Sequence, residues 1–191
     1  MAGRRPVTGR TRSLVLFLDR RILWLSEHWL ALFNTLAGLY AGLPVLAPVL
    51  AALGLFTPAR LIYFVYRYLC HQRPERSFFI AGHQVAFCER DTALYVAVFL
   101  AGVAYALSGR RWRPLSAWGV GALLLPLVVD GTLQLFFPYE STWSVRVVTG
   151  VLAGGGAVWF LYPRLALAFA QVNWDVKRQL GRARLRDQDA S

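Results

Sequence analysis

Long apolar stretches alternate with short polar ones along the chain. Hydrophobic residues dominate four runs, at about residues 29–56, 92–107, 115–137 and 144–162. Each run is close to the roughly 20 helical residues that cross a ~30 Å hydrocarbon core. The pattern therefore predicts an all-α protein, an integral membrane bundle of four transmembrane helices with interfacial amphipathic helices beside it.

The first apolar run is longer than a single span requires. Pro44 and Pro48 lie inside it and predict a kink or a tilt that accommodates the extra length. Before this run, apolar residues recur at helical spacing among charged ones from Leu14 to Leu25. We interpret this stretch as an amphipathic helix on the inner leaflet of the membrane, because charged residues interrupt it too often for a cleavable signal peptide.

A polar segment, residues 57–91, joins the first two spans. Thr57 is expected to cap a short interfacial helix, with Pro58 as its first residue and its end near Cys70. The expected organisation is a basic arm and interfacial helix over 1–28, a transmembrane domain over 29–162 that contains the loop 57–91, and a basic tail over 163–191.

Composition agrees with a membrane protein, since 57% of the residues are hydrophobic and only 16% are charged. The net charge of +11 would also suit a nucleic-acid-binding protein, but the basic residues are unevenly placed. Fifteen of the 21 Lys and Arg residues lie near the two termini or in the loop 108–114. The positive-inside rule then predicts a multi-pass plasma-membrane protein with both termini in the cytoplasm, and no nucleic-acid partner is needed to explain the charge.

The same rule puts the segments 57–91 and 138–146 outside. The first of them contains both cysteines of the chain and two of its three histidines. Two interpretations of the cysteines are equally supported. Cys70 and Cys88 form a disulfide, which an oxidising compartment permits, or they bind a metal ion, for which thiolates are suitable ligands. The metal would be zinc or another transition metal, and its candidate ligands are Cys70, His71, Cys88 and Asp91, with His83 as a substitute.

Polar residues inside the spans give a second candidate site. An ionisable group in hydrocarbon costs at least ~2.5 kcal/mol and usually faces a bundle interior or a wet cavity. Helical counting places Gln134 one turn above Asp130, Arg146 level with Gln134, and Thr149 level with Asp130. We therefore expect Asp130, Gln134 and Arg146 to form the catalytic floor of a pocket that opens outward. The alternative is a structural ion pair between Asp130 and Arg146.

Glycines are also concentrated in the last span. Residues 150 and 154–156 are glycine, which lets a neighbouring helix approach closely. Gly38 and Gly42 of the first span offer a matching surface, so the first and last spans are expected to pack there.

Two stretches carry a family resemblance. "CHQRPERSFFIAGHQVAFCERD" and "PLVVDGTLQLFFPYESTWSVRVVTG" resemble the pattern of a family of small prokaryotic membrane proteins catalogued only as a domain of unknown function. The resemblance runs from about Leu69 to Gly155 and implies no activity. It supports as motif positions Cys70, His71, Arg76, Ser77, Cys88, Arg90, Asp130, Gln134, Ser141, Arg146 and Gly150.

One departure from the family pattern concerns the second cysteine. Many relatives have Cys-x-Arg-Cys where this chain has Cys88-Glu89-Arg90-Asp91. The aspartate keeps a zinc-competent ligand but removes a third thiol.

These features leave three classes of function. The favoured hypothesis is a membrane enzyme or transporter that acts on an anionic or lipid-linked substrate, in contact with membrane lipids. The alternatives are a thiol-redox protein that uses a Cys70–Cys88 disulfide, and a non-catalytic subunit of an oligomer or membrane complex. The candidate substrate-binding residues are Arg76, Ser77, Arg90, Glu140, Ser141 and Thr149.

Overall fold

The computed structural model describes residues 9–188, which form two compact units. The smaller unit combines residues 9–31 with 165–188, and the larger one spans 32–164. In the described part of the chain, four helical segments are long and apolar enough to cross a membrane: Ser13–Ala52, Glu89–Leu107, Ala117–Phe136 and Trp143–Gly181. The predicted helical membrane fold with four spans is thereby confirmed.

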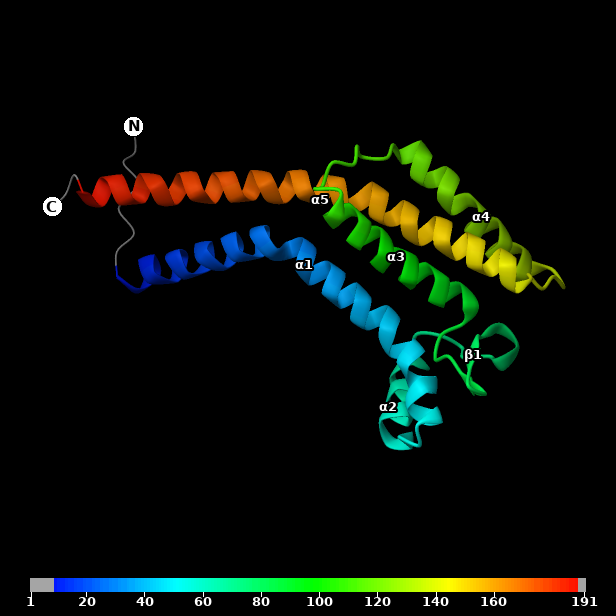
Figure 1. Ribbon diagram of the computed structural model, residues 1–191. Helices are drawn as coiled ribbons and strands as arrows, with labels where there is room; N and C mark the ends of the chain where they lie inside the picture. Colours follow the sequence, from blue (N-terminus) through cyan, green and yellow to red (C-terminus); the bar gives the residue numbers. More distant parts are fainter. Residues whose placement is uncertain (1–8, 189–191) are drawn as a thin grey trace. The chain divides into compact units, whose positions relative to one another are not determined.

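The helices and strands can be followed in Figure 1. They are α1 (Arg10–Ala52), α2 (Phe56–Tyr66), the 3-10 helix η1 (Pro74–Arg76), β1 (Phe79–Ile80), β2 (His83–Gln84), α3 (Glu89–Leu107), α4 (Ala117–Phe136) and α5 (Trp143–Gln188). With 43 and 46 residues, α1 and α5 each have about twice the residues that a membrane span requires. The amphipathic stretch and the first span are therefore one unbroken helix, and the last span continues into the basic tail.

The smaller unit is a pair of helical segments from the two ends of the chain. The rings of Trp29 and Phe169 stack with their centroids 5.3 Å apart. The Asn173 side-chain amide donates to the Ser26 hydroxyl at 3.0 Å. These contacts hold the first part of α1 against the last part of α5, and the site described below lies in the other unit.

The two prolines of α1 attach the polar segment to this helix. Proline has no N–H, so Pro44 and Pro48 leave the carbonyls of Tyr40 and Pro44, four residues earlier, without a helical donor. The Tyr66 hydroxyl donates to the Tyr40 carbonyl at 3.0 Å. The Ala86 N–H donates to the Pro44 carbonyl at 3.2 Å. The helix defects that proline creates thus become binding points for the segment that follows α1.

The start of α2 differs from the prediction. Leu55 is its N-cap and no side chain caps the helix, so the expected cap at Thr57 is wrong. The chain turns at Gly54 in the left-handed region (φ 76°), and the Leu55 N–H already bonds the Leu50 carbonyl at 2.9 Å. Because this turn reverses the chain tightly, the new helix begins before Thr57 is reached. It ends at Tyr66, earlier than expected.

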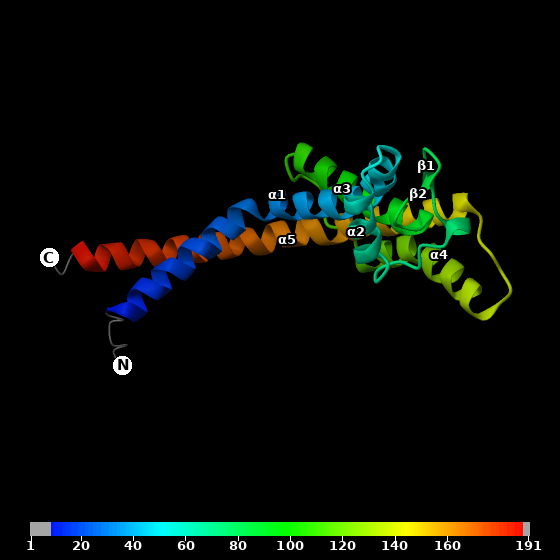
Figure 2. The same ribbon diagram turned by 90° about the horizontal axis from the view of Figure 1, so that it is seen from below.

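Residues 67–88 fold back over α1 and lead to α3. Phe79 pairs with Gln84, and Ile80 pairs with His83, in the antiparallel hairpin of β1 and β2. Its two turn residues, Ala81 and Gly82, both have positive φ, as in the tight turns that match the strand twist. The hairpin projects from the helices of its unit in Figure 2.

The segment around the hairpin is anchored by aromatic side chains. Tyr66 and Phe87 are buried, and their ring centroids lie 4.9 Å apart with the rings nearly perpendicular. Tyr40 of α1 packs on both rings, and Tyr95 of α3 packs on the ring of Phe87. This cluster fixes the segment against both helices and so positions Cys70 and Cys88, which belong to the same core.

Glycines of α5 bring two other helices close. A Cβ atom at Gly150 or Gly154 would collide with the backbone of α3, at the carbonyls of Arg90 and Leu94 respectively. Gly156 faces α4 instead. The helix α5 therefore lies between α3 and α4 in this unit, as Figure 1 shows.

The expected glycine contact between the first and last spans is wrong. Gly38 of α1 faces the ring of Phe99 on α3, and a Cβ at Gly42 would meet no atom within 4 Å. The helix α3 takes the place next to the glycines of α5, because Gly150 and Gly154 pack on its backbone. This arrangement brings the first turn of α3 beside the polar residues of α4 and α5.

Candidate functional site

A cavity of about 520 Å³ opens where residues 67–88, the start of α3 and the turn between α4 and α5 meet. We call the end of the unit where these elements meet the loop end. Its walls contain two thiols, a carboxylate and four arginine side chains, together with Gln134. The two polar segments identified in the sequence thus contribute to one site.

Three potential metal ligands form one wall of the cavity. The Sγ atoms of Cys70 and Cys88 and a carboxylate oxygen of Asp91 lie within 4.8 Å of one another. Cys88 is the N-cap of α3 and its sulfur accepts the Asp91 N–H at 3.4 Å. The Cys70 sulfur accepts the Cys88 N–H at 3.2 Å. The expected proximity of the two cysteines is confirmed, and both are free thiols.

The two thiols are electrostatically unequal. The hydrogen bond from Cys88 lowers the pKa of Cys70 below its ordinary value, and backbone N–H groups add to this effect although burial opposes it. The same hydrogen bond raises the pKa of Cys88, and burial and the nearby Asp91 charge raise it further. Cys70 is therefore the thiol that ionises first, and the Cys88 thiol donates a hydrogen bond to the resulting thiolate.

The two histidines expected as ligands lie outside this cluster. His71 is exposed and lines the cavity, but it does not belong to the three mutually close ligands. His83 lies in β2 opposite Ile80. The chain turns at Gln72 with φ 46°, and the Gln72 amide bonds the Ala86 carbonyl at 3.2 Å. This turn sets the direction of the backbone just after Cys70, which spacing in the sequence does not reveal.

Three ion pairs connect the elements around the cavity. Arg90 of α3 pairs with Asp130 of α4. Arg146 of α5 pairs with Glu89 of α3 at 3.0 Å, and Arg76 pairs with Glu140 at 2.8 Å. The alternative of an Asp130–Arg146 ion pair is therefore wrong, because the first turn of α3 supplies a partner to each of them.

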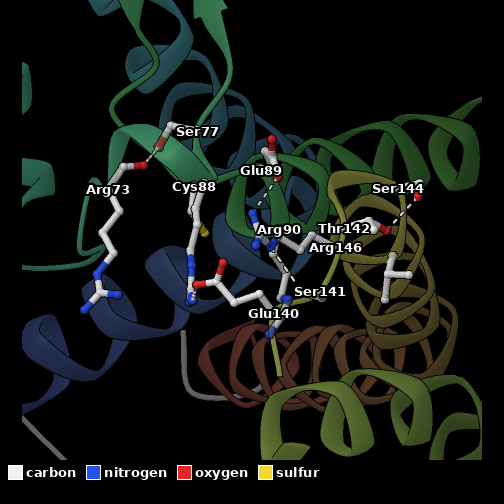
Figure 3. Close-up of polar contacts among 12 residues, drawn as sticks. Arg73, Ser77, Cys88, Glu89, Arg90, Glu140, Ser141, Thr142, Ser144 and Arg146 are labelled. Atoms are coloured by element: carbon white, nitrogen blue, oxygen red, sulfur yellow. Dashed lines mark hydrogen bonds and ion pairs between the residues drawn. The ribbon is translucent and has the colours of Figure 1, made fainter. Parts of the chain in front are cut away.

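Asp130 and Arg146 are nevertheless linked through two polar side chains. The Gln134 amide donates to the Asp130 carboxylate at 2.8 Å and to the Ser141 hydroxyl at 2.9 Å. The Arg146 Nε donates to the same hydroxyl at 3.1 Å. Figure 3 shows Arg146 between Glu89 and Ser141. Gln134 also accepts a hydrogen bond from Arg76 at 3.4 Å, so one network joins α3, α4 and α5.

Some atoms of this network have no partner. The Nε atoms of Arg76 and Arg90 and one carboxylate oxygen of Asp130 are buried without a hydrogen bond. Each such group costs about 1–3 kcal/mol or more when charged. Gln134 and Arg146 line the cavity, whereas Asp130 is 5% exposed and lies behind them.

Arg73 differs from the other arginines of the cavity. In the described part of the chain its guanidinium has no ion-pair partner, and the residue is exposed. Its carbonyl accepts the Ser77 hydroxyl at 2.9 Å, and its side chain extends away from that contact in Figure 3. Arg73 is thus the cation that remains available to a ligand.

Four predicted substrate-binding residues do not line the cavity. Ser77 is buried, and its hydroxyl accepts the Gln84 amide at 3.0 Å. Ser141 is buried in the network, and Thr149 donates to carbonyls of its own helix. The Glu140 side chain is 74% exposed and holds Arg76. These residues support the site, while Arg76 and Arg90 face the cavity as predicted.

Three residues of the site were not recognised as such in the sequence. Glu89 pairs with Arg146 across 57 residues, a contact that the spacing of residues along the chain does not predict. Gln72 and Gln84 hold the loop, since Gln84 donates to the Gln72 carbonyl at 2.7 Å. Each glutamine follows a histidine, and the repeated His-Gln pair is the sequence signal that distinguishes these two glutamines.

The comparisons with known proteins identify two uncharacterized relatives. The chain is 36% identical to the uncharacterized protein MJ1492 of Methanocaldococcus jannaschii over 104 residues, which cover 53% of the chain and 67% of the relative. It is 33% identical to an uncharacterized protein of Methanothermobacter thermautotrophicus over 91 residues, which cover 48% of the chain and 82% of the relative.

No solved structure matches the chain. Residues 70–160 match the family model described as "Predicted membrane protein (DUF2085)", and they contain all the lining residues of the cavity except Leu69. The protein is therefore a membrane protein that belongs to this family.

Proposed function

We propose that the protein is a metal-dependent membrane enzyme whose substrate carries an anionic group such as a phosphate. The observation behind this proposal is the convergence of Cys70, Cys88 and Asp91, within 4.8 Å of one another, on the wall of a cavity that arginines also line. Ligands and arginines come from three separate segments of the chain, so the fold has to bring them together.

The ligand types favour zinc. Thiolates and carboxylates both bind this ion, and catalytic zinc sites have three protein ligands and leave a fourth place for water or substrate. A bound zinc ion would lower the pKa of such a water to ~7 and polarise a phosphoryl or carbonyl oxygen. Asp91 and Cys88 are held by the first turn of α3, and Cys70 is held by the Cys88 N–H, so the set is preorganised.

The arginines supply anion-binding donors. A guanidinium has five N–H donors, and the ion pairs of Arg76 and Arg90 occupy only part of each guanidinium while both residues line the cavity. Arg73 adds a cation that has no ion-pair partner in the described chain. Arginine binds phosphate and carboxylate oxygens in a bidentate manner, which fixes the orientation of a substrate as well as its charge.

The distribution of charge supports a location for the site. Fifteen basic residues lie near the two ends of the sequence or in the loop 108–114, and this loop follows the end of α3 that is opposite to the cavity. By the positive-inside rule the cavity then opens to the outer side of the plasma membrane.

The test is metal analysis of the purified chain from zinc-supplemented cells. We expect stoichiometric zinc in the unchanged protein and its loss in Cys70→Ser, Cys88→Ser and Asp91→Asn. His83→Ala is the matched control, because His83 belongs to the same segment but not to the cluster. A zinc-free unchanged protein, or full zinc retention in the cysteine variants, would refute the proposal.

A second candidate is thiol–disulfide exchange, favoured by two free thiols whose Sγ atoms lie within 4.8 Å of each other and by the opposite pKa shifts of Cys70 and Cys88. The Cys70 thiolate would attack a substrate disulfide and release one substrate thiol. Cys88 would then give up its proton, displace the second substrate thiol and close the Cys70–Cys88 disulfide. The protein loses two electrons and the substrate disulfide gains them. A count of free thiols in the metal-free protein before and after exposure to a disulfide tests this candidate.

A further inference from the structure

A second cavity, of about 450 Å³, lies between the membrane-spanning helices α3 and α5. We call it the apolar groove. Small and β-branched residues at four-residue spacing line it on both helices, namely Ala93, Ala97 and Ala101 on α3 and Val147, Val151 and Gly155 on α5. Thr92 is the polar exception near the first turn of α3, and Phe78 lies beside it.

The groove is hollow because small side chains follow a close helix contact. Gly150 and Gly154 bring the backbones of α3 and α5 together, and the alanines beside this contact do not fill the space along it. A Cβ atom at Gly155 would meet no atom within 4 Å, so the groove is open at that level. Its length from Thr92 to Ala101 is about 13 Å at ~1.5 Å per residue.

The groove begins beside the polar cavity. Arg90 and Asp91 line the cavity, and the next residue, Thr92, lines the groove. On α5, Arg146 lines the cavity and Val147 lines the groove. Consecutive helical residues point about 100° apart at ~3.6 residues per turn. The two hollows therefore occupy neighbouring faces of the same helices at the loop end.

We propose that the apolar groove holds an acyl chain of a membrane lipid whose phosphate headgroup lies among the arginines of the cavity. This inference rests on the proposed function, since it makes the anionic substrate a lipid phosphate. Charge complementarity favours this occupant, because Arg73, Arg76 and Arg90 lie at the end where the headgroup would be.

The two hollows would contribute differently to recognition. A lipid chain that moves from the bilayer into the groove exchanges one apolar environment for another, so this transfer adds little affinity. The headgroup contacts with arginine therefore supply selectivity, and the groove fixes the position of the chain. A neutral lipid would lack the headgroup contacts and would not be selected.

Photo-crosslinking tests the proposal on the full chain in phosphatidylcholine nanodiscs. The probe is phosphatidic acid with a diazirine in one acyl chain, and the comparison is diacylglycerol with the same chain. We expect several-fold more labelling from phosphatidic acid, on peptides of α3 and α5. Arg73→Gln should reduce this preference several-fold, because it removes a cavity cation that has no carboxylate partner in the described part of the chain.

Variants that fill the groove give the decisive comparison. Ala97→Phe should reduce labelling of α3 and α5 at least fivefold. Gly155→Leu should reduce this labelling by the same factor, and it provides the test if Ala97→Phe fails to fold. The control is Val128→Phe on α4, where the original side chain is 58% exposed. Equal labelling by both lipids, or unchanged labelling in folded groove variants, would overturn the proposal.

Metal content in the same samples separates this proposal from the proposed function. Selective labelling of the groove in a zinc-free protein would support the lipid site and refute the metal site. A zinc-loaded protein without selective labelling would refute the lipid site alone.

Discussion

Glu89 and Arg146 form an ion pair between α3 and α5 with an N–O distance of 3.0 Å, and their side chains are only 11% and 8% exposed. A charged group that loses its partner at a place with so little exposure is poorly compensated by water. Removal of one member of a buried pair typically costs about 3–5 kcal/mol. The pair therefore has to be intact for α3 to stay in register with α5.

The first prediction is that Glu89→Gln destabilises the protein by about 3–5 kcal/mol, as measured by unfolding in mixed micelles. The matched control is Glu27→Gln, because the Glu27–Lys177 pair has the same 3.0 Å distance but side chains 48% and 58% exposed. Exposed pairs contribute little, so the control should lose far less stability than Glu89→Gln. Equal effects of the two substitutions would contradict the assignment.

The second prediction concerns Asp130 and Arg90. Asp130→Leu and Arg90→Met should each be destabilising, because each leaves an unpaired charge whose side chain is at most 20% exposed. The double variant should be more stable than either single one, since both charges are then absent. A double-mutant cycle in mixed micelles measures this coupling, and strict additivity of the two effects would show that the ion pair does not exist.

Helical counting along the α4–α5 hairpin predicted part of this network. It placed Gln134 near Asp130 and Arg146, and the structure joins these residues through Ser141. It failed for the ion pairs because their partners, Glu89 and Arg90, belong to α3. The contact of α3 with Gly150 brings them there, and the spacing of residues along the chain does not encode a contact with a third helix.

The spans themselves were predictable because an apolar run of about 20 residues has few other stable solutions. The proximity of Cys70 and Cys88 was also predictable, since membrane helices hold both ends of the loop. The place of His71 was not. It depends on the left-handed turn at Gln72, and glutamine has no strong preference that would announce a positive φ.

The third prediction tests the proline-dependent contact between α1 and α2. Tyr66→Phe removes the donor to the Tyr40 carbonyl, which Pro44 leaves without its helical partner. We expect a loss of about 1–3 kcal/mol in the free energy of unfolding. Tyr68→Phe is the control, because the Tyr68 side chain is 68% exposed. No difference between the two variants would mean that the hydroxyl contributes nothing.

The fourth prediction concerns pH. The hydrogen bond and charge of Arg76 hold the pKa of Glu140 below its ordinary value of 4.5. A carboxylate with a lowered folded-state pKa stabilises the fold above its unfolded-state pKa, and this contribution disappears as the pH falls through the folded-state value. The unchanged protein should therefore be more stable than Glu140→Gln near neutral pH. The difference in melting temperature should shrink below about pH 4.5. A pH-independent difference would exclude this linkage.

The last prediction is the orientation of the chain in the membrane. The basic residues near the termini and in the loop 108–114 outnumber the others by fifteen to six, and the positive-inside rule places that excess in the cytoplasm. A green fluorescent protein fused after Ser191 should therefore fluoresce, and an alkaline phosphatase fused there should be inactive in a bacterial host. A protease site inserted between Ala81 and Gly82, in the hairpin turn, should be cleaved by a protease added outside the membrane. Both turn residues are exposed, so the protease can reach the site. The opposite result in both assays would place the cavity on the cytoplasmic side and remove the basis for an outward-facing site.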